Sequence, residues 1–149
     1  LNYAMSLHAI VTAHEEGYDE NLYLDPQTRT FVEETGGANF LFVTKDGTVV
    51  TPKSDSILPS ITRRSLLIVA EKYLGLKVEE REIHEFAECG LCGTAAVISP
   101  VGKVVDHGKE IGFGSDSENP GPVCMKLRET LLDIQLGKIE APEGWIYEI

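Results

Sequence analysis

Residues 39–75 read NFLFVTKDGTVVTPKSDSILPSITRRSLLIVAEKYLG, and this stretch decides the class of fold. It opens with two apolar runs joined at Asp46-Gly47, a pair that is typical of a tight β-hairpin. A helix follows, for which Ser60 is the expected N-cap and Gly75 the expected end. The apolar face of this helix carries Leu66, Val69, Ala70 and Tyr73. A hairpin followed by an amphipathic helix predicts an α/β domain.

The segments on either side extend the same alternation of helices and strands. Upstream, we expect a helix over residues 3–16, ended by Gly17, and short strands over residues 21–25 and 30–36. Downstream, we expect strands over residues 76–82 and 95–105. The last predicted helix starts at Pro122, ends before Gly137, and has Val123, Leu127, Leu131 and Ile134 along one side. Residues 1–149 are therefore expected to form one domain.

Composition excludes several classes of partner. The 149 residues carry a formal net charge of -11, so a nucleic-acid backbone or an anionic membrane would be repelled. Apolar stretches are far shorter than the roughly 20 residues that span a bilayer. Three cysteines, an odd number, argue against a disulfide framework and favour a reducing compartment. We expect a cytoplasmic protein that binds neither nucleic acid nor membrane.

Two cysteines, Cys89 and Cys92, form a C-x-x-C pair with three competing interpretations. A structural zinc site needs four ligands, but Cys124 stands apart and His84 is the nearest histidine, so no metal is expected. A thioredoxin-like pair would begin a helix, whereas here an apolar β-rich stretch follows. A peripheral redox switch stays open beside the third interpretation, small apolar residues near a ligand pocket.

Three places could bind a ligand on their residue types alone. The start of the helix after Pro59 offers free amides and the Thr62 hydroxyl to a phosphate, or is simply a capped surface helix. The CGTAA segment with Thr94 allows close approach of a ligand to the backbone, or only close strand packing. One acid of Glu33-Glu34 could be buried and functional, or both could lie on a solvated edge.

Read in order, six segments resemble the branched-chain amino-acid aminotransferases over nearly the whole chain. They are LNYAMSLHAIVTAHEEGYDENLYLD, VEETGGANFLFV, TPKSDSILPSITRRSLLIVAEKYLGLKVEERE, CGTAAVISPVGKV, NPGPVCMKLRETLLDIQLGK and GWIYEI. The resemblance implies the fold of the fold-type IV enzymes, as in D-amino-acid aminotransferase, which depend on pyridoxal 5′-phosphate. It matches their large C-terminal domain, a mixed β-sheet or pseudo-barrel with surrounding helices.

The resemblance also implies roles around the cofactor ring. Glu34 matches the glutamate of the family's E-x-G-x-x-N pattern, which pairs with the pyridine nitrogen, and Glu33 would point the other way. A carboxylate there keeps the ring protonated as an electron sink. Leu58 would pack against the ring, and Tyr3, from the family's G-G-N-Y, would hydrogen-bond the phenolic oxygen.

Further roles concern the phosphate and the substrate. The family's L-P-G-I-T-R matches LPSITR, so the amides of Ile61 and Thr62 and the Thr62 hydroxyl would bind the phosphate. Thr94 resembles another phosphate donor, and the amide of Ala95 would hold the substrate carboxylate. Ser60 replaces the family's glycine, which puts the loop geometry in question.

Two further departures concern what the chain lacks. The Schiff-base lysine would lie three positions before Leu1, and the family's small N-terminal domain is absent, so no catalytic residue is expected in this chain and we expect it to be inactive alone. Between Ile83 and Phe86 the family has a longer stretch, which indicates a deletion or, as we favour, missing residues.

The function implied is transfer of the amino group of leucine, isoleucine or valine to 2-oxoglutarate by a homodimer. Within the same fold, a D-amino-acid aminotransferase or an aminodeoxychorismate lyase is the alternative. A non-catalytic binding domain, regulated by redox at the cysteine pair, is the alternative from a different class.

Overall fold

The computed structural model describes residues 6–80, 86–116 and 118–147. Two expectations fall outside that part of the chain: the position of Tyr3, and the path of the short junction after Ile83. No helix in the described part is long and apolar enough to cross a membrane.

In the described part of the chain, seven strands form the main sheet, which is built around β3. The strands are β1 (Leu22–Leu24), β2 (Val32–Thr35), β3 (Asn39–Val43), β4 (Val49–Thr51), β5 (Val78–Glu80), β6 (Glu88–Gly93) and β7 (Val97–Pro100). Along one edge β3 pairs with β6 over its whole length, and along the other it pairs with β4 and then β2. Only the β4–β5 pair is parallel among these ladders, so the sheet is mixed, as expected.

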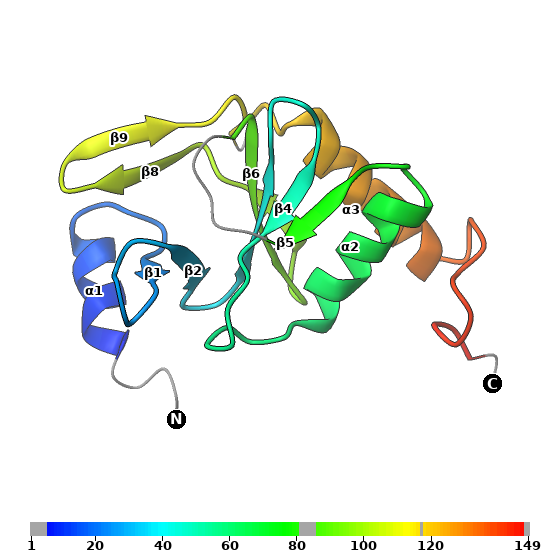
Figure 1. Ribbon diagram of the computed structural model, residues 1–149, viewed down its shortest axis with the longest axis horizontal. Coiled ribbons are helices and arrows are strands. Elements are labelled where there is room, and N and C mark those ends of the chain that lie inside the picture. Colours follow the sequence, from blue (N-terminus) through cyan, green and yellow to red (C-terminus); the bar gives the residue numbers. More distant parts are fainter. Residues whose placement is uncertain (1–5, 81–85, 117, 148–149) are drawn as a thin grey trace.

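Among the residues that the structure describes, three helices accompany the sheet: α1 (Leu7–Glu15), α2 (Ile61–Lys72) and α3 (Pro122–Gln135). The two longer ones, α2 and α3, pack against each other and against β6. Figure 1 shows them together on one side of the molecule, at the opposite end from α1. A separate antiparallel hairpin, β8 (Lys103–Asp106) with β9 (Lys109–Gly112), extends from the body on the α1 side (Figure 1).

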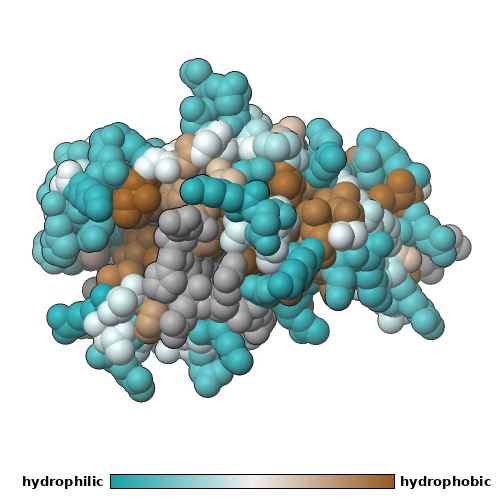
Figure 2. All heavy atoms as spheres, turned by 45° about the horizontal axis from the view of Figure 1, so that its top comes forward, coloured by the Kyte–Doolittle hydropathy of each residue, from teal (hydrophilic) through white to brown (hydrophobic). Residues whose placement is uncertain are grey.

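Buried side chains form two clusters, one on each face of β3. On the helix-covered face, alternate residues of β3 meet α2 and α3; this cluster includes Leu41, Val43, Leu66, Val69, Cys92, Leu127, Leu131 and Ile134. On the other face, Phe40 and Phe42 pack with Val50 and Cys89. Because β3 is buried along both faces, its residues after Asn39 are all apolar. Figure 2 shows hydrophobic residues exposed in several places on one face of the molecule, with hydrophilic residues between and around them.

Capping and glycine residues correctly predicted where α2 begins, where α2 and α3 end, and where the chain turns between β3 and β4. Ser60 caps α2, since its hydroxyl accepts a hydrogen bond from the Arg63 amide at 3.2 Å. Gly75 and Gly137 follow α2 and α3 with φ values of +61° and +68°, the left-handed conformation in which glycine ends helices. Gly47, at φ +83°, turns the chain between β3 and β4.

In the second half, one prediction was wrong and two strands were missed. Residues 95–105 do not form one strand: Ala95 and Ala96 lie in a turn, and the rest is divided between β7 and β8. The strand β6, which contains the cysteine pair, was not predicted, because glycines and cysteines at 89–93 conceal its alternation. The exposed strand β9 was not predicted either, since it lacks apolar alternation.

Candidate functional site

The Glu34 carboxylate lies at the point where β2, β3 and the approach to α2 meet. Its Oε2 accepts hydrogen bonds from the Asn39 side-chain amide and from the Leu58 backbone amide, both at 3.2 Å. Asn39 is 4% exposed and also donates to the Leu58 carbonyl at 3.2 Å. Asn39 therefore joins the strand to the segment that leads into α2 and holds one oxygen of Glu34 in place.

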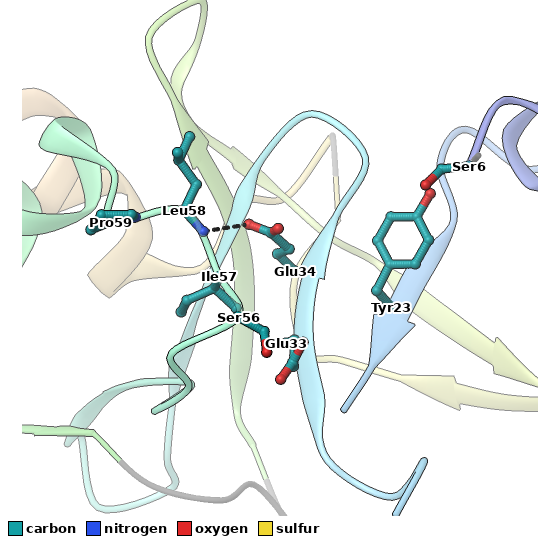
Figure 3. Close-up of a pocket in the computed structure, with 8 residues that line it drawn as sticks. All are labelled: Ser6, Tyr23, Glu33, Glu34, Ser56, Ile57, Leu58 and Pro59. Atoms are coloured by element: carbon teal, nitrogen blue, oxygen red, sulfur yellow. Dashed lines mark hydrogen bonds between the residues drawn. The ribbon is translucent and has the colours of Figure 1, made fainter. Parts of the chain in front are cut away.

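Glu33 has a different set of contacts. It is buried, and its Oε1 accepts a hydrogen bond from the Ser54 hydroxyl at 2.5 Å. Figure 3 shows the two carboxylates pointing in different directions, Glu34 toward the Leu58 amide and Glu33 away from it. The expectation that these neighbours point different ways therefore agrees with the structure.

The first turn of α2 presents two free amides. The Ser60 hydroxyl accepts from Arg63 N and the Ser60 carbonyl accepts from Arg64 N, at 3.2 and 3.1 Å. The amides of Ile61 and Thr62 have no acceptor within the part of the chain that the structure describes. An anion would find there two backbone donors and the positive end of the helix dipole. The serine at position 60 thus caps the helix and leaves both amides available.

The segment with Thr94 forms the exposed turn between β6 and β7. Thr94, Ala95 and Ala96 are all exposed. Val97 has a φ of +64°, which is unusual for a β-branched residue, and the Ile98 amide bonds back to the Ala96 carbonyl at 2.8 Å. The turn is sharp, and it directs its small residues away from the core.

Strand pairing brings these places to one end of the sheet. Glu34 pairs with Asn39, and Asn39 pairs with Cys92, two positions before Thr94. Because neighbouring strands lie about 4.8 Å apart, β2 and β6 are separated by about 10 Å across β3. Leu58, bonded to Glu34, is two positions before Ser60. The strand pairing and the Leu58 bond thus put the glutamate, the start of α2 and the β6–β7 turn at the same end of the sheet.

A pocket of about 400 Å³ opens beside Glu34 (Figure 3). The residues that line it are Ser6, Tyr23, Glu33, Glu34, Ser56, Ile57, Leu58 and Pro59. Of the aliphatic side chains in this region, Leu58 in the lining is 59% exposed and Ile61, outside it, is 74% exposed, which is high for such residues. An apolar ring against Leu58 would cover part of that surface.

The cysteine pair does not contribute a reactive group. Cys89 and Cys92 are both fully buried, and their odd spacing on β6 puts them on opposite faces of the sheet, in different clusters. They cannot bond to each other or share a metal ion from those positions. Burial raises the pKa of Cys92 to about 12 and that of Cys89 well above its ordinary value. Both behave as small core residues.

Comparison with known proteins shows the family to which the chain belongs. Residues 1–104 match the model of the class IV aminotransferases, so the chain belongs to that family. Among curated proteins, a branched-chain-amino-acid aminotransferase of Helicobacter pylori is 48% identical over 99% of this chain and 44% of its own length. One from Haemophilus influenzae is also 48% identical, over 99% of the chain and 46% of its own length.

Solved structures of branched-chain amino acid aminotransferases are similar to this chain as well. The branched-chain amino acid aminotransferase of Thermobaculum terrenum, in its PLP form, superposes with a TM-score of 0.78 and 35% identity, over 93% of this chain and 44% of that one. The enzyme from Escherichia coli superposes with a TM-score of 0.77 and 31% identity, over 98% of this chain and 48% of that one. The chain therefore spans a little less than half the length of these relatives, and the expected fold is confirmed.

Sequence reasoning missed two residues of this region. Asn39 is the last residue of the E-x-G-x-x-N pattern, and no role was predicted for it. It lies five positions after Glu34 across a tight hairpin, and this spacing could have indicated that the two residues face each other. Tyr23, which lines the pocket from β1, carried no signal, because an aromatic residue in a short strand is ordinary.

Proposed function

We propose that residues 1–149 form the cofactor-binding part, the large C-terminal domain, of a pyridoxal phosphate-dependent aminotransferase. The observation that carries the proposal is the fixed Glu34 carboxylate, held by Asn39 and Leu58, beside the two free amides at the start of α2. One end of this arrangement suits a protonated ring nitrogen and the other suits a phosphate. Pyridoxal phosphate carries both groups on a single ring.

Each residue has a defined part in this proposal. When bound, the cofactor supplies an electron sink for the carbanion formed at the substrate α-carbon. Glu34 keeps the ring nitrogen protonated, and Leu58 covers one face of the ring. Ile61 and Thr62 bind the phosphate through their amides and the Thr62 hydroxyl, assisted by Thr94. The exposed amide of Ala95 binds the carboxylate of the substrate, and Tyr3 binds the phenolic oxygen of the ring.

We infer from the relatives that the complete protein transfers the amino group of leucine, isoleucine or valine to 2-oxoglutarate, as a homodimer. Support comes from identity of 48% to proteins named branched-chain-amino-acid aminotransferase. The proton transfer at the α-carbon requires a base, for which we propose a lysine three positions before Leu1. A D-amino-acid aminotransferase or an aminodeoxychorismate lyase remains the alternative within this fold.

A redox-regulated binding domain is the alternative from another class, and the burial of Cys89 and Cys92 on opposite faces argues against it.

The proposal is tested on the complete polypeptide. We expect an absorbance band of bound pyridoxal phosphate, and borohydride reduction should attach the pyridoxyl group to the lysine three positions before Leu1, as mapped by peptide mass spectrometry. Transfer to 2-oxoglutarate should be fastest with leucine, isoleucine and valine. A protein that takes up no pyridoxal phosphate would contradict the cofactor assignment; uptake together with preference for D-alanine would contradict only the substrate assignment.

A further inference from the structure

The hydroxyl of Tyr23 is buried without a hydrogen-bond partner in the part of the chain that the structure describes. It belongs to β1 and lines the same pocket as Glu34. Figure 3 shows its ring on the side of the pocket opposite Leu58, with the hydroxyl end directed toward Ser6. A buried hydroxyl that gives up water without gaining a partner destabilises a protein, so one left in a pocket indicates a missing partner.

The surrounding protein groups do not supply that partner. Glu33 is bonded to Ser54, and Glu34 to Asn39 and Leu58. The Ser6 side chain makes no capping bond to α1 and none to Tyr23. The hydroxyl therefore has a free donor at the edge of a pocket in which both carboxylates are already held by protein donors. What it lacks is an acceptor: it makes no hydrogen bond to either carboxylate, and a ligand or a water bound beside it can supply one.

We propose that Tyr23 is a further ligand-binding residue, whose hydroxyl donates a hydrogen bond to the ring-bearing ligand held by Glu34, either directly or through one water. This inference rests on the proposed function, because it places an aromatic phosphate ester in the pocket. Tyr23 would fix the ring from the side opposite Leu58. The two residues, from β1 and from the approach to α2, would then set the tilt of the ring relative to Glu34.

The test uses Tyr23→Phe in the complete polypeptide, since phenylalanine keeps the aromatic ring and removes only the hydroxyl. The apo-protein is titrated with pyridoxamine 5′-phosphate, which forms no covalent link and so reports non-covalent affinity. We expect Kd to rise roughly tenfold, because one hydrogen bond to the ligand is lost. The melting temperature of the apo-protein should stay the same or rise, because no bond is lost there. An unchanged Kd would overturn the inference.

Two controls distinguish the loss of a ligand contact from a loss of stability and from a failure of the proposed function. Tyr73→Phe removes a hydroxyl that donates to the Glu140 carbonyl at 2.7 Å, so it should lower the melting temperature and leave Kd unchanged. If the unaltered protein binds neither pyridoxamine phosphate nor pyridoxal phosphate, the proposed function itself fails, which is a distinct outcome.

Discussion

The Glu34 carboxylate and the Leu58 backbone amide are joined by a hydrogen bond of 3.2 Å across 24 positions of sequence. This contact ties the end of β2 to the loop that leads into α2. Asn39 reinforces it by donating to both partners, to Glu34 Oε2 and to the Leu58 carbonyl. The position of the acid is therefore set by the same bonds that hold the α2 entrance against the sheet.

Replacing Asn39 with alanine should weaken both the fold and the site. The substitution removes two hydrogen bonds from a residue that is 4% exposed, so we expect the free energy of unfolding to fall by roughly 1–3 kcal/mol. Urea denaturation measures the change. Asn119→Ala, at an exposed position, is the matched control and should change stability by no more than about 0.5 kcal/mol. Equal stability of the two variants would show that the Asn39 bonds contribute nothing.

Glu34→Gln and Glu33→Gln should differ in their effect on amino-group transfer, because only Glu34 is proposed to act on the cofactor. Glutamine keeps an acceptor oxygen for Leu58 but removes the charge opposite the ring nitrogen, so we expect amino-group transfer to slow by roughly 10–100-fold. Glu33→Gln keeps an acceptor for the Ser54 hydroxyl, so its transfer rate should stay within a few-fold of the original. Steady-state kinetics measure the transfer rate of both variants. A larger loss in Glu33→Gln than in Glu34→Gln would show that the roles of the two acids have been exchanged.

The three cysteines should be unreactive while the protein is folded. Burial raises the pKa of Cys92 and of Cys124 to about 12 and holds that of Cys89 well above its ordinary value. At pH 8 almost no thiolate is therefore present at these positions, and the thiolate is the reactive form. Peptide mapping after iodoacetamide treatment should find Cys89, Cys92 and Cys124 unlabelled in the native protein and labelled in guanidinium. Rapid native labelling of Cys89 or Cys92 would restore the redox hypothesis.

Glu88 should prove structural, by holding the start of α3. Glu88 is 5% exposed, and its carboxylate accepts hydrogen bonds from the amides of Val123 and Cys124 at 3.1 and 2.9 Å. Glu88→Ala leaves both amides without an acceptor, so we expect a loss of roughly 2–4 kcal/mol in unfolding free energy. Glu88→Gln retains one acceptor oxygen and should lose about half as much. Guanidinium denaturation distinguishes the two, and an alanine variant as stable as the original would refute the capping role.

Features decided by neighbouring residues could be predicted from the sequence. The Ser60 cap, the glycine ends of α2 and α3, and the β3–β4 hairpin depend on backbone preferences within a few positions. The assignment of Glu34 as the functional acid came from a resemblance to a known family. Strand β6 escaped prediction because glycine and cysteine carry little polar or apolar contrast, so the period of two is hidden.

By itself, then, the sequence determined the three helices, the strands of the first half, the Ser60 cap and the family, because these depend on local spacing and on motifs. Only the tertiary structure decided which side chains meet. The antiparallel pairing of β2, β3 and β6 put Glu34, Asn39 and Cys92 in one row, and packing on both faces of β6 separated Cys89 from Cys92. The unpartnered Tyr23 hydroxyl likewise appeared only when β1 was placed beside the pocket. Contacts across many positions depend on how the strands pair, and no short stretch of sequence contains that information.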